Sequence, residues 1–304
     1  MQTPPDPIPA EVHVTPTVVR ALLQAQHPDL ADVPITPLAE GWDNAIFRLG
    51  ETWLARIPRR STGADLLVHE LRWLPHLAPH LPIPTPVAHR RGVPTADYPY
   101  PWSIVPWFPG TPAGAASTFD PAASAEALGS FLRTLHNLPL PDDPPHNPFR
   151  ACPLTERDPH FRERLAHLID LDQAAVVRRW ETLLAAPPPQ TRCWCHGDLH
   201  PFNLVLDPRG QIAAVLDWGD LTAGDPAVDL MVAWLQLPLD AHARFRAELP
   251  HLDDAMWARG QAWGLRMALM FIDAGRNMGG STHGQHFERI GLTTLRRCLS
   301  SEKA

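Results

Sequence analysis

The stretch from His196 to Asn203, HGDLHPFN, gathers residue types that can do chemistry at two different kinds of site. In a metal hydrolase, His196, Asp198 and His200 would each donate a ligand atom to a transition metal. In a phosphoryl-transfer loop, Asp198 would take the proton of an acceptor hydroxyl, and Asn203 would bind magnesium through its amide oxygen. The residues around the stretch must decide between these two chemistries.

The metal-hydrolase hypothesis lacks a second group of ligands. Downstream of His200 the chain offers carboxylates, but no further histidine before His242. Upstream, Cys193 and Cys195 have no second cysteine pair with the spacing of a zinc site. The sequence therefore disfavours a metal bound by histidine side chains.

A third oxygen donor favours phosphoryl transfer. Asp217 ends the return strand of a predicted hairpin that begins directly after Asn203, and Gly219 follows it closely. A single Asp or Asn in a turn is common and has no chemical meaning by itself. Asp198, Asn203 and Asp217 in this order would supply a base for the hydroxyl and two oxygen ligands for magnesium between nucleotide phosphates.

The composition excludes other classes of protein. Lys303 is the only lysine of the 304 residues, so the chain has neither a Walker A lysine nor a buried lysine for Schiff-base chemistry. The net charge of -7 and the pI near 6.1 disfavour a nucleic acid as partner and suit a cationic small molecule.

The chain is expected to be cytoplasmic and not to bind membranes. Its four cysteines are too few and too scattered for a disulfide framework, which fits a reducing compartment. The first residues lack the basic and apolar regions of a secretory signal. The longest apolar stretch, LMVAWLQLPL, is shorter than the roughly 20 residues that a membrane span needs.

The N-terminal third must supply the elements that face a nucleotide. A helix is predicted over residues 15–26, followed by three short strands, ITPLA, AIFRLG and TWLARIP, that form an antiparallel meander. A second helix is predicted over residues 63–77, with leucines at positions 67, 71 and 74 on one face. Glu70 lies on this apolar face, where it either pairs with a cation or reaches water at the edge of the stripe.

Beyond Pro109 the sequence becomes mostly helical. One insertion interrupts the helices, because LVLD, a PRG turn and IAAVLDW read as a short hairpin that carries polar groups at its ends. Helices are predicted over residues 122–138, 155–185, 226–237, 241–249, 253–276 and 282–299.

Three segments, HGDLHPFNLVLD, VLDWGDLTAGDPAVDL and EGWDNAIFRL, resemble the aminoglycoside phosphotransferase family, relatives of protein kinases and choline kinases. The resemblance spans about residues 37–237. It implies an α+β, bilobal, protein-kinase-like fold, with a small antiparallel-sheet N-terminal lobe and a mostly helical C-terminal lobe. Residues 1–108 would form the nucleotide-binding lobe with its leading helix and hinge, and residues 109–304 would hold the catalytic loop and the substrate site.

The resemblance also implies roles for the residues of the catalytic loop. Asp198 would be the catalytic aspartate, and Asn203 and Asp217 would be the two magnesium ligands. Three further residues would hold the loop in place: His196, Asp225 and Asp229.

The same resemblance predicts the contacts to ATP or GTP. Arg56 stands where kinases usually have the phosphate-binding lysine, with Glu70 as its expected ion-pair partner. An arginine can contact phosphate and carboxylate groups bidentately, so this role is chemically possible. The remaining nucleotide contacts would come from a turn that covers the phosphates and a hinge that faces the base: Gly41, Trp42, Asp43, Asn44, Pro106, Trp107 and Phe108.

The acceptor is predicted to be a small molecule with a hydroxyl group, first of all a cationic, aminoglycoside-like antibiotic. The acids that would bind such a cation are Asp220, Asp273 and Glu288. A macrolide would instead need an apolar trough, and the candidates to line it are Trp257, Trp263, Met267 and Met270. Choline, homoserine or a sugar would be alternative acceptors, and a pseudokinase that binds nucleotide without turnover is the alternative to an enzyme.

Overall fold

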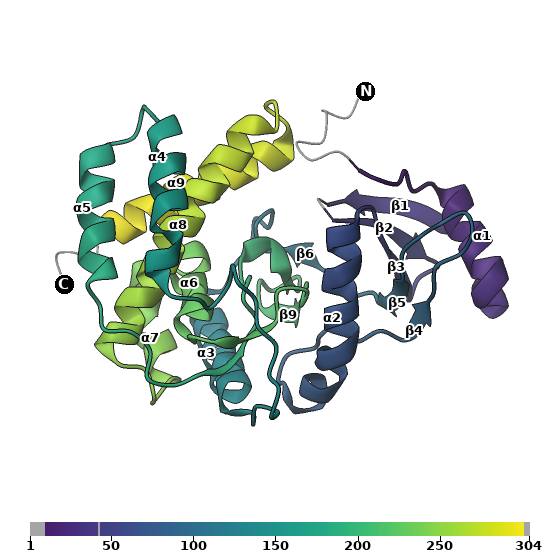
Figure 1. Cartoon of the computed structure of the whole chain (residues 1–304), viewed down its shortest axis with the longest axis horizontal. Coiled ribbons are helices and arrows are strands. Elements are labelled where there is room, and N and C mark those ends of the chain that lie inside the picture. The colour runs from purple at the N-terminus through teal and green to yellow at the C-terminus, as the bar shows by residue number, and fades with distance from the viewer. Residues whose placement is uncertain (1–9, 42, 301–304) are drawn as a thin grey trace.

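The computed structural model describes residues 10–41 and 43–300. A β-sheet flanked by two helices lies at one end of the molecule, and a larger group of helices lies at the other, which is the predicted α+β, bilobal arrangement (Figure 1). Trp42, one of the predicted nucleotide-binding residues, falls outside the described residues.

The sheet is antiparallel throughout. Its strands are β1 (Ile35–Glu40), β2 (Asn44–Leu49), β3 (Trp53–Pro58), β4 (Arg90–Gly92) and β5 (Trp102–Pro106). They lie side by side in the order β1-β2-β3-β5-β4. The first three form the meander predicted from the sequence, and Gly50 adopts a φ of 57° in the tight turn between β2 and β3.

The first predicted helix, α1 (Pro16–Gln26), packs on the sheet. Thr15 caps the helix by accepting a hydrogen bond from the N–H of Val18 at 3.3 Å. Buried and part-exposed residues alternate along β2, as expected for a strand with one covered face. The buried residues of both elements form one apolar cluster: Val19, Leu22, Leu23, Ala45, Phe47 and Leu49.

The second predicted helix, α2 (Ser61–Leu77), stands between the sheet and the helical part of the molecule (Figure 1). Gly63 permits a close approach to the sheet, because a Cβ at this position would lie 2.6 Å from the carbonyl oxygen of Asp43. Glu70 lies on the buried face of α2 and is only 2% exposed. The alternative that Glu70 reaches water at the edge of the apolar stripe is therefore wrong.

The helical part contains five of the predicted helices within two residues of their expected ends. These are α3 (Pro121–Asn137), α6 (Ala227–Gln236), α7 (His242–Ala247), α8 (Asp254–Asn277) and α9 (Thr282–Ser300). Helix α8 packs most extensively against α9 and α6. Short 3-10 turns join several elements: η1 (Pro28–Leu30), η2 (Ala78–His80), η4 (Pro201–Asn203) and η5 (Leu239–Ala241).

The prediction of a single helix over residues 155–185 is wrong. The segment forms η3 (Leu154–Arg157), α4 (Asp158–His167) and α5 (Gln173–Leu184). Asp172 explains the break, because its carboxylate accepts a hydrogen bond from the N–H of Ala175 at 3.0 Å and so caps a new helix. As a result, α4 and α5 lie side by side (Figure 1).

Two small sheets hold the polar segments of the helical part. β8 (Leu204–Leu206) and β9 (Ile212–Val215) form the predicted antiparallel hairpin, and β6 (Thr111–Pro112) adds to the other side of β8. β7 (Cys193–Cys195) and β10 (Thr222–Gly224) also pair antiparallel, which the sequence did not predict. HGDLHPFN therefore begins where β7 ends, and residues 217–220 run from β9 to β10.

The helical part has its own apolar core, separate from the cluster beside the sheet. Trp263 and Met267 of α8 are fully buried in this core, so the expectation that they line a trough for a macrolide is wrong. Among the described residues, no helix is both long and apolar enough to cross a membrane.

Candidate active site

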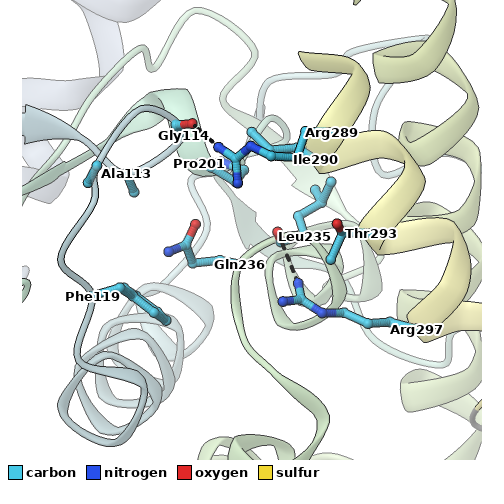
Figure 2. Close-up of a pocket in the computed structure, with 11 residues that line it drawn as sticks. Ala113, Gly114, Phe119, Pro201, Leu235, Gln236, Arg289, Ile290, Thr293 and Arg297 are labelled. Carbon is cyan, nitrogen blue, oxygen red and sulfur yellow. Dashed lines mark hydrogen bonds between the residues drawn. The ribbon is translucent and has the colours of Figure 1, made fainter. Parts of the chain in front are cut away.

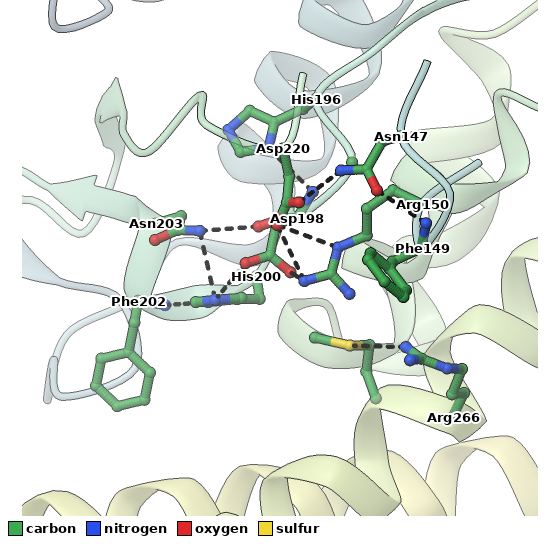
Figure 3. A network of polar contacts seen from close by, with 12 residues as sticks. Asn147, Phe149, Arg150, His196, Asp198, His200, Phe202, Asn203, Asp220 and Arg266 are labelled. Carbon is green, nitrogen blue, oxygen red and sulfur yellow. Dashed lines mark hydrogen bonds and ion pairs between the residues drawn. The ribbon is translucent and has the colours of Figure 1, made fainter. Parts of the chain in front are cut away.

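The chain turns sharply at Gly197, directly after β7. Gly197 has a φ of 85°, and a Cβ there would lie 2.5 Å from the carbonyl oxygen of Asp220. Glycine is the residue that fits such a turn without strain or clash. The turn places Asp198 in a network of polar contacts (Figure 3).

Asp229, near the start of α6, fixes the backbone at Gly197 by two hydrogen bonds. Its Oδ2 accepts a hydrogen bond from the N–H of His196, and its Oδ1 accepts one from the N–H of Gly197, both at 2.9 Å. Asp225 is bound by the guanidinium of Arg259 through two contacts of 2.7 and 3.1 Å. Both acids are buried, so their charges serve the internal structure of the loop.

The ring of His196 uses both of its nitrogens within the loop. Nε2 donates to the carbonyl oxygen of Leu216 at 3.0 Å, and Nδ1 accepts a hydrogen bond from the N–H of Asp198 at 3.3 Å. These contacts join the catalytic-loop turn to the end of β9. They leave His196 no ring nitrogen for a metal.

The carboxylate of Asp198 has two cationic or polar neighbours. Its Oδ1 lies 2.8 Å from Nη2 of Arg150, and its Oδ2 lies 3.3 Å from Nε2 of His200. Nδ1 of His200 accepts the N–H of Phe202, so Nε2 carries the proton that faces Asp198. Burial alone would raise the pKa of Asp198, but the charge of Arg150, followed by the hydrogen bond from His200, holds this pKa well below its usual range.

Arg150 also contacts a second acid, Asp220. Nη2 of Arg150 lies 3.1 Å from Oδ2 of Asp220, and the side-chain amide of Asn147 donates to Oδ1 of Asp220 at 2.7 Å. Burial raises the pKa of Asp220, although the charge of Arg150 opposes the rise. Ala151, next to Arg150, has a positive φ of 52°, which indicates that tertiary contacts fix this segment.

The sequence gives no sign of a role for Arg150 or Asn147, and it suggests His200 only as a ligand in the disfavoured metal site. Arg150 comes from an irregular, proline-rich segment 48 residues before Asp198. No periodicity or motif marks such a residue. Only the pairing of β7 with β10, together with hydrogen bonds from residues 145–151 to that pair, brings it to the site.

Asn203 and Asp217 present oxygen atoms of the kind that magnesium prefers. The amide Nδ2 of Asn203 donates to the backbone oxygen of Asp198 at 2.9 Å, which leaves its Oδ1 for another partner. The two residues are connected, because the N–H of Leu216 donates to the backbone oxygen of Asn203 at 2.8 Å. Asp217 has a positive φ of 58° and a side chain that is 55% exposed. An amide and a carboxylate oxygen held in this way fit a magnesium ion.

Arg56 and Glu70 form a buried ion pair with 2.6 Å between Nη1 and Oε1. The second oxygen of Glu70 accepts the N–H of Trp218 at 3.1 Å, and Nη2 of Arg56 lies 3.7 Å from Asp217. Glu70 therefore links the sheet, helix α2 and the segment after Asp217. Arg56, which the resemblance aligns with the usual kinase lysine, thus lies beside Asp217, the expected magnesium ligand.

The predicted phosphate-covering turn is closed by its own backbone. The N–H of Gly41 donates to the carbonyl oxygen of Asn44 at 2.9 Å, so this N–H is engaged within the turn. The carboxylate of Asp43 pairs with Arg60 at 2.7 Å. These contacts anchor the turn to the residues that follow β3.

The predicted hinge, residues 106–108, has few free donors. Pro106 has no N–H, and the N–H of Trp107 donates to the carbonyl oxygen of Thr52 at 2.8 Å. In the described part of the chain, the N–H of Phe108 makes no hydrogen bond. It is the one hinge N–H left for a nucleotide base.

A comparison with models of known protein families identifies the family of the chain. The model of the phosphotransferase enzyme family matches residues 34–263. The chain belongs to this family. The match confirms the resemblance drawn from the catalytic-loop segments and includes every residue of the Asp198 network.

Two curated relatives of this chain are aminoglycoside 3'-phosphotransferases. The protein from Streptomyces fradiae is 30% identical over 166 residues, which cover 50% of this chain and 62% of the relative. The protein from Streptomyces ribosidificus is 33% identical over 147 residues, which cover 46% of this chain and 55% of the relative. The chain thus spans less than two thirds of either relative.

Solved structures share the fold at lower identity. The GDP and kanamycin complex of APH(2")-IIia has a TM-score of 0.70 and 19% identity, and the match covers 93% of this chain and 99% of that one. Macrolide 2'-phosphotransferase MphH from Brachybacterium faecium has a TM-score of 0.59 and 23% identity, covering 89% and 97%. These matches confirm the kinase-like, bilobal fold of the chain.

The three acids predicted to bind a cationic acceptor are all paired with arginines in the structure. Asp220 contacts Arg150 as described above. Asp273 pairs with Arg164 at 3.2 Å, and Glu288 pairs with Arg276 at 2.8 Å. None of the three therefore presents an uncompensated carboxylate to an ammonium group.

Proposed function

We propose that the chain is a magnesium-dependent O-phosphotransferase that moves the γ-phosphate of ATP or GTP to a hydroxyl of a small molecule. One observation carries this proposal. The ionised carboxylate of Asp198 stands in a braced turn, and the amide of Asn203 is bonded to the backbone of the same residue. Asp217 lies just after the end of β9, and its carboxylate is 3.7 Å from Nη2 of Arg56.

Each side chain has a definite task in the transfer. The acceptor oxygen forms a bond to the γ-phosphorus, the bond from that phosphorus to the bridging oxygen breaks, and the nucleoside diphosphate leaves. The hydroxyl proton passes to a carboxylate oxygen of Asp198. Because its pKa lies low, Asp198 orients the hydroxyl first and takes the proton late.

Positively charged groups would bind the phosphates of the nucleotide. Arg56, held by Glu70, would contact phosphate oxygens with its remaining donors. Asn203 and Asp217 would hold the magnesium ion, which supplies neutralising charge between the phosphates when it is bound. The N–H of Phe108 would bind the nucleotide base.

Similarity alone points first to an aminoglycoside-like acceptor, because both curated relatives carry that name. Macrolides, choline, homoserine and sugars are alternative acceptors. These molecules differ in charge, so the charged residues near Asp198 distinguish among them. A cytoplasmic location is part of this proposal, because the sequence has only four, scattered cysteines, which fits a reducing compartment.

The test is a turnover screen with the whole chain. ATP and GTP are each offered with magnesium and with aminoglycosides, macrolides, choline, homoserine and sugars, and nucleotide consumption is recorded for the wild type and for Asp198→Ala. Acceptor-dependent consumption that is lost in the variant is expected. Nucleotide binding without any Asp198-dependent consumption would show that the chain is a pseudokinase.

A further inference from the structure

Four arginines of the helical lobe carry positive charge beside the candidate active site. The guanidinium of Arg157 lies 5.6 Å from the centre of the Phe149 ring, and Figure 3 shows this ring between Arg150 and Arg266. Arg150 precedes η3, Arg157 ends η3, Arg164 lies in α4 and Arg266 lies in α8. Burial, followed by the like charges of Arg150, Arg164 and Arg157, lowers the pKa of Arg266 to about 10. We call these four residues the arginine cluster.

Two members of the arginine cluster are compensated by carboxylates. Arg150 binds Asp198 and Asp220. Arg164 binds Asp273 at 3.2 Å. Their charges are therefore already in use within the protein.

The other two members are not compensated in this way. In the described part of the chain, no carboxylate lies within ion-pair distance of Arg266, whose neighbours are the sulfur of Met267 at 4.0 Å and the ring of Trp263 at 5.5 Å. The nearest carboxylate to Arg157 is that of Glu156 at 4.0 Å, and the Nε of Arg157 is buried without a hydrogen-bond partner among the described residues. The carboxylates that the structure describes around the cluster, Asp198, Asp220, Asp273 and the more distant Glu156, thus contact the other three arginines and not Arg266. The unmet positive charge lies at Arg266 and at the buried Nε of Arg157.

The arginine cluster borders the proposed catalytic carboxylate. Arg150 contacts Asp198 directly, and the ring of His200, which also contacts Asp198, lies 5.3 Å from the ring of Phe271 in α8. Arg266 lies five residues before Phe271 in the same helix. Figure 3 shows Arg266 on α8 below the catalytic loop, with Phe149 between it and Arg150.

An uncompensated guanidinium in this position is costly unless a ligand supplies the missing charge. Like charges that share a partly buried site repel one another, and each loses hydration. A polycationic acceptor would add to the repulsion. A carboxylate or phosphate would relieve it and could accept paired hydrogen bonds from the planar guanidinium groups.

We propose that Arg266 and Arg157 form a subsite for an acidic group of the acceptor, a carboxylate or a phosphate, while the acceptor hydroxyl faces Asp198. The proposal rests on the phosphotransferase function proposed above and narrows its substrate class from cationic to anionic hydroxyl compounds. It replaces the expectation that Asp220, Asp273 and Glu288 bind an ammonium group.

A matched series of small acceptors tests the charge preference. Glycerol, choline, D-glycerate and glycerol 3-phosphate all carry a hydroxyl but differ in charge, and the last two distinguish a carboxylate from a phosphate. Asp198-dependent kcat/KM is expected to be at least about tenfold higher for an acidic member than for glycerol or choline, because each charge-assisted contact contributes on the order of 1.5 kcal/mol or more. Equal or better turnover of choline or an aminoglycoside would overturn the subsite and leave the phosphotransferase function intact.

Substitutions test whether Arg266 forms part of the subsite. Arg266→Gln is expected to raise the dissociation constant of D-glycerate or glycerol 3-phosphate at least about tenfold in calorimetric titrations. Arg276→Gln removes an arginine that is bound to Asp170 and Glu288 and is not a member of the cluster, and it is expected to leave both affinities unchanged. Unchanged affinity in Arg266→Gln would contradict the proposal.

Two further measurements separate loss of the subsite from loss of the fold and from failure of the proposed function. Arg266→Met removes one of four like charges, so its thermal midpoint is expected to be at least that of the wild type while anion binding is lost. Arg266-dependent binding of D-glycerate by a chain that shows no Asp198-dependent turnover would support the subsite and contradict the phosphotransferase function.

Discussion

The guanidinium of Arg150 lies 2.8 Å from Oδ1 of Asp198 and 3.1 Å from Oδ2 of Asp220. One cation therefore holds both the proposed base and the acid that follows Asp217 in the chain. Two carboxylates could not share this partly buried place without it, because their mutual repulsion and lost hydration would be uncompensated. Arg150 thus acts through Asp198, as a residue that positions it.

Replacing Arg150 tests this positioning role. Arg150→Gln is expected to lower kcat by roughly 10- to 100-fold, the scale of misplacing a reacting group by about 1 Å. The KM for the nucleotide should stay unchanged, and Arg150→Lys should recover part of kcat. Arg162→Gln, which removes an exposed pair on α4, is the matched control. A wild-type kcat in Arg150→Gln would refute the role.

The Arg56–Glu70 pair predicts linked effects on stability and nucleotide binding. Glu70→Gln removes the charge that compensates the buried Arg56 and leaves one acceptor oxygen where Arg56 and the N–H of Trp218 now use two, so the free energy of unfolding should fall by about 3–5 kcal/mol. Arg56→Ala should weaken nucleotide binding in calorimetric titrations. Glu126→Gln, at an exposed pair with Arg244, should cost at most about 1 kcal/mol. Unchanged nucleotide affinity in Arg56→Ala would show that Arg56 does not replace the usual lysine.

Two glycines with similar backbone conformations provide a controlled test of the catalytic turn. Gly197 and Gly280 have φ angles of 85° and 75°, but a Cβ at Gly197 would lie 2.5 Å from Asp220, whereas a Cβ at Gly280 meets nothing within 4 Å. Gly280→Ala should cost about 1 kcal/mol of stability from its backbone alone. Gly197→Ala should cost more and also abolish turnover. Equal effects of the two substitutions on kcat would mean that the close approach to Asp220 is unimportant.

Because His242 is buried, we expect the free energy of unfolding to fall in acid. It is buried between α6 and α7 and donates to the carbonyl oxygen of Ala233 at 2.9 Å, and its burial lowers its pKa below the usual 6.5. As the pH falls through 6.5, the unfolded chain takes up the proton before the folded chain does, so the free energy of unfolding decreases. Denaturant unfolding at about pH 7.5 and about pH 5.5 should show a smaller decrease for His242→Gln than for the wild type. An identical decrease would rule out this contribution.

The elements that depend on local patterns could be predicted from the sequence. The caps at Thr15 and Asp253, the alternation in β2 and the periodicity of α8 are local properties, and these elements lie close to their predicted positions. The short spacing within HGDLHPFN likewise fixed how Asp198 and Asn203 lie relative to each other.

Features that depend on distant parts of the chain could not be predicted in the same way. The pairing of β7 with β10 joins segments of three residues each, too short for a periodic signal. Arg150 reaches Asp198 only through that pairing. Asp273 and Glu288 form ion pairs with arginines from α4 and α8. The sequence does not reveal these pairs, so it predicts both acids as ligands for a cation.

The central claim is that Asp198 directs the γ-phosphate to a hydroxyl of an acceptor. The most direct measurement is phosphorus NMR of the whole chain with ATP or GTP, magnesium and an acceptor found in the turnover screen, compared with Asp198→Asn. The account predicts a new phosphomonoester signal from the wild type, and its loss in a variant that keeps the wild-type circular dichroism spectrum and nucleotide affinity. The same signal from Asp198→Asn, or only inorganic phosphate from the wild type, would contradict it.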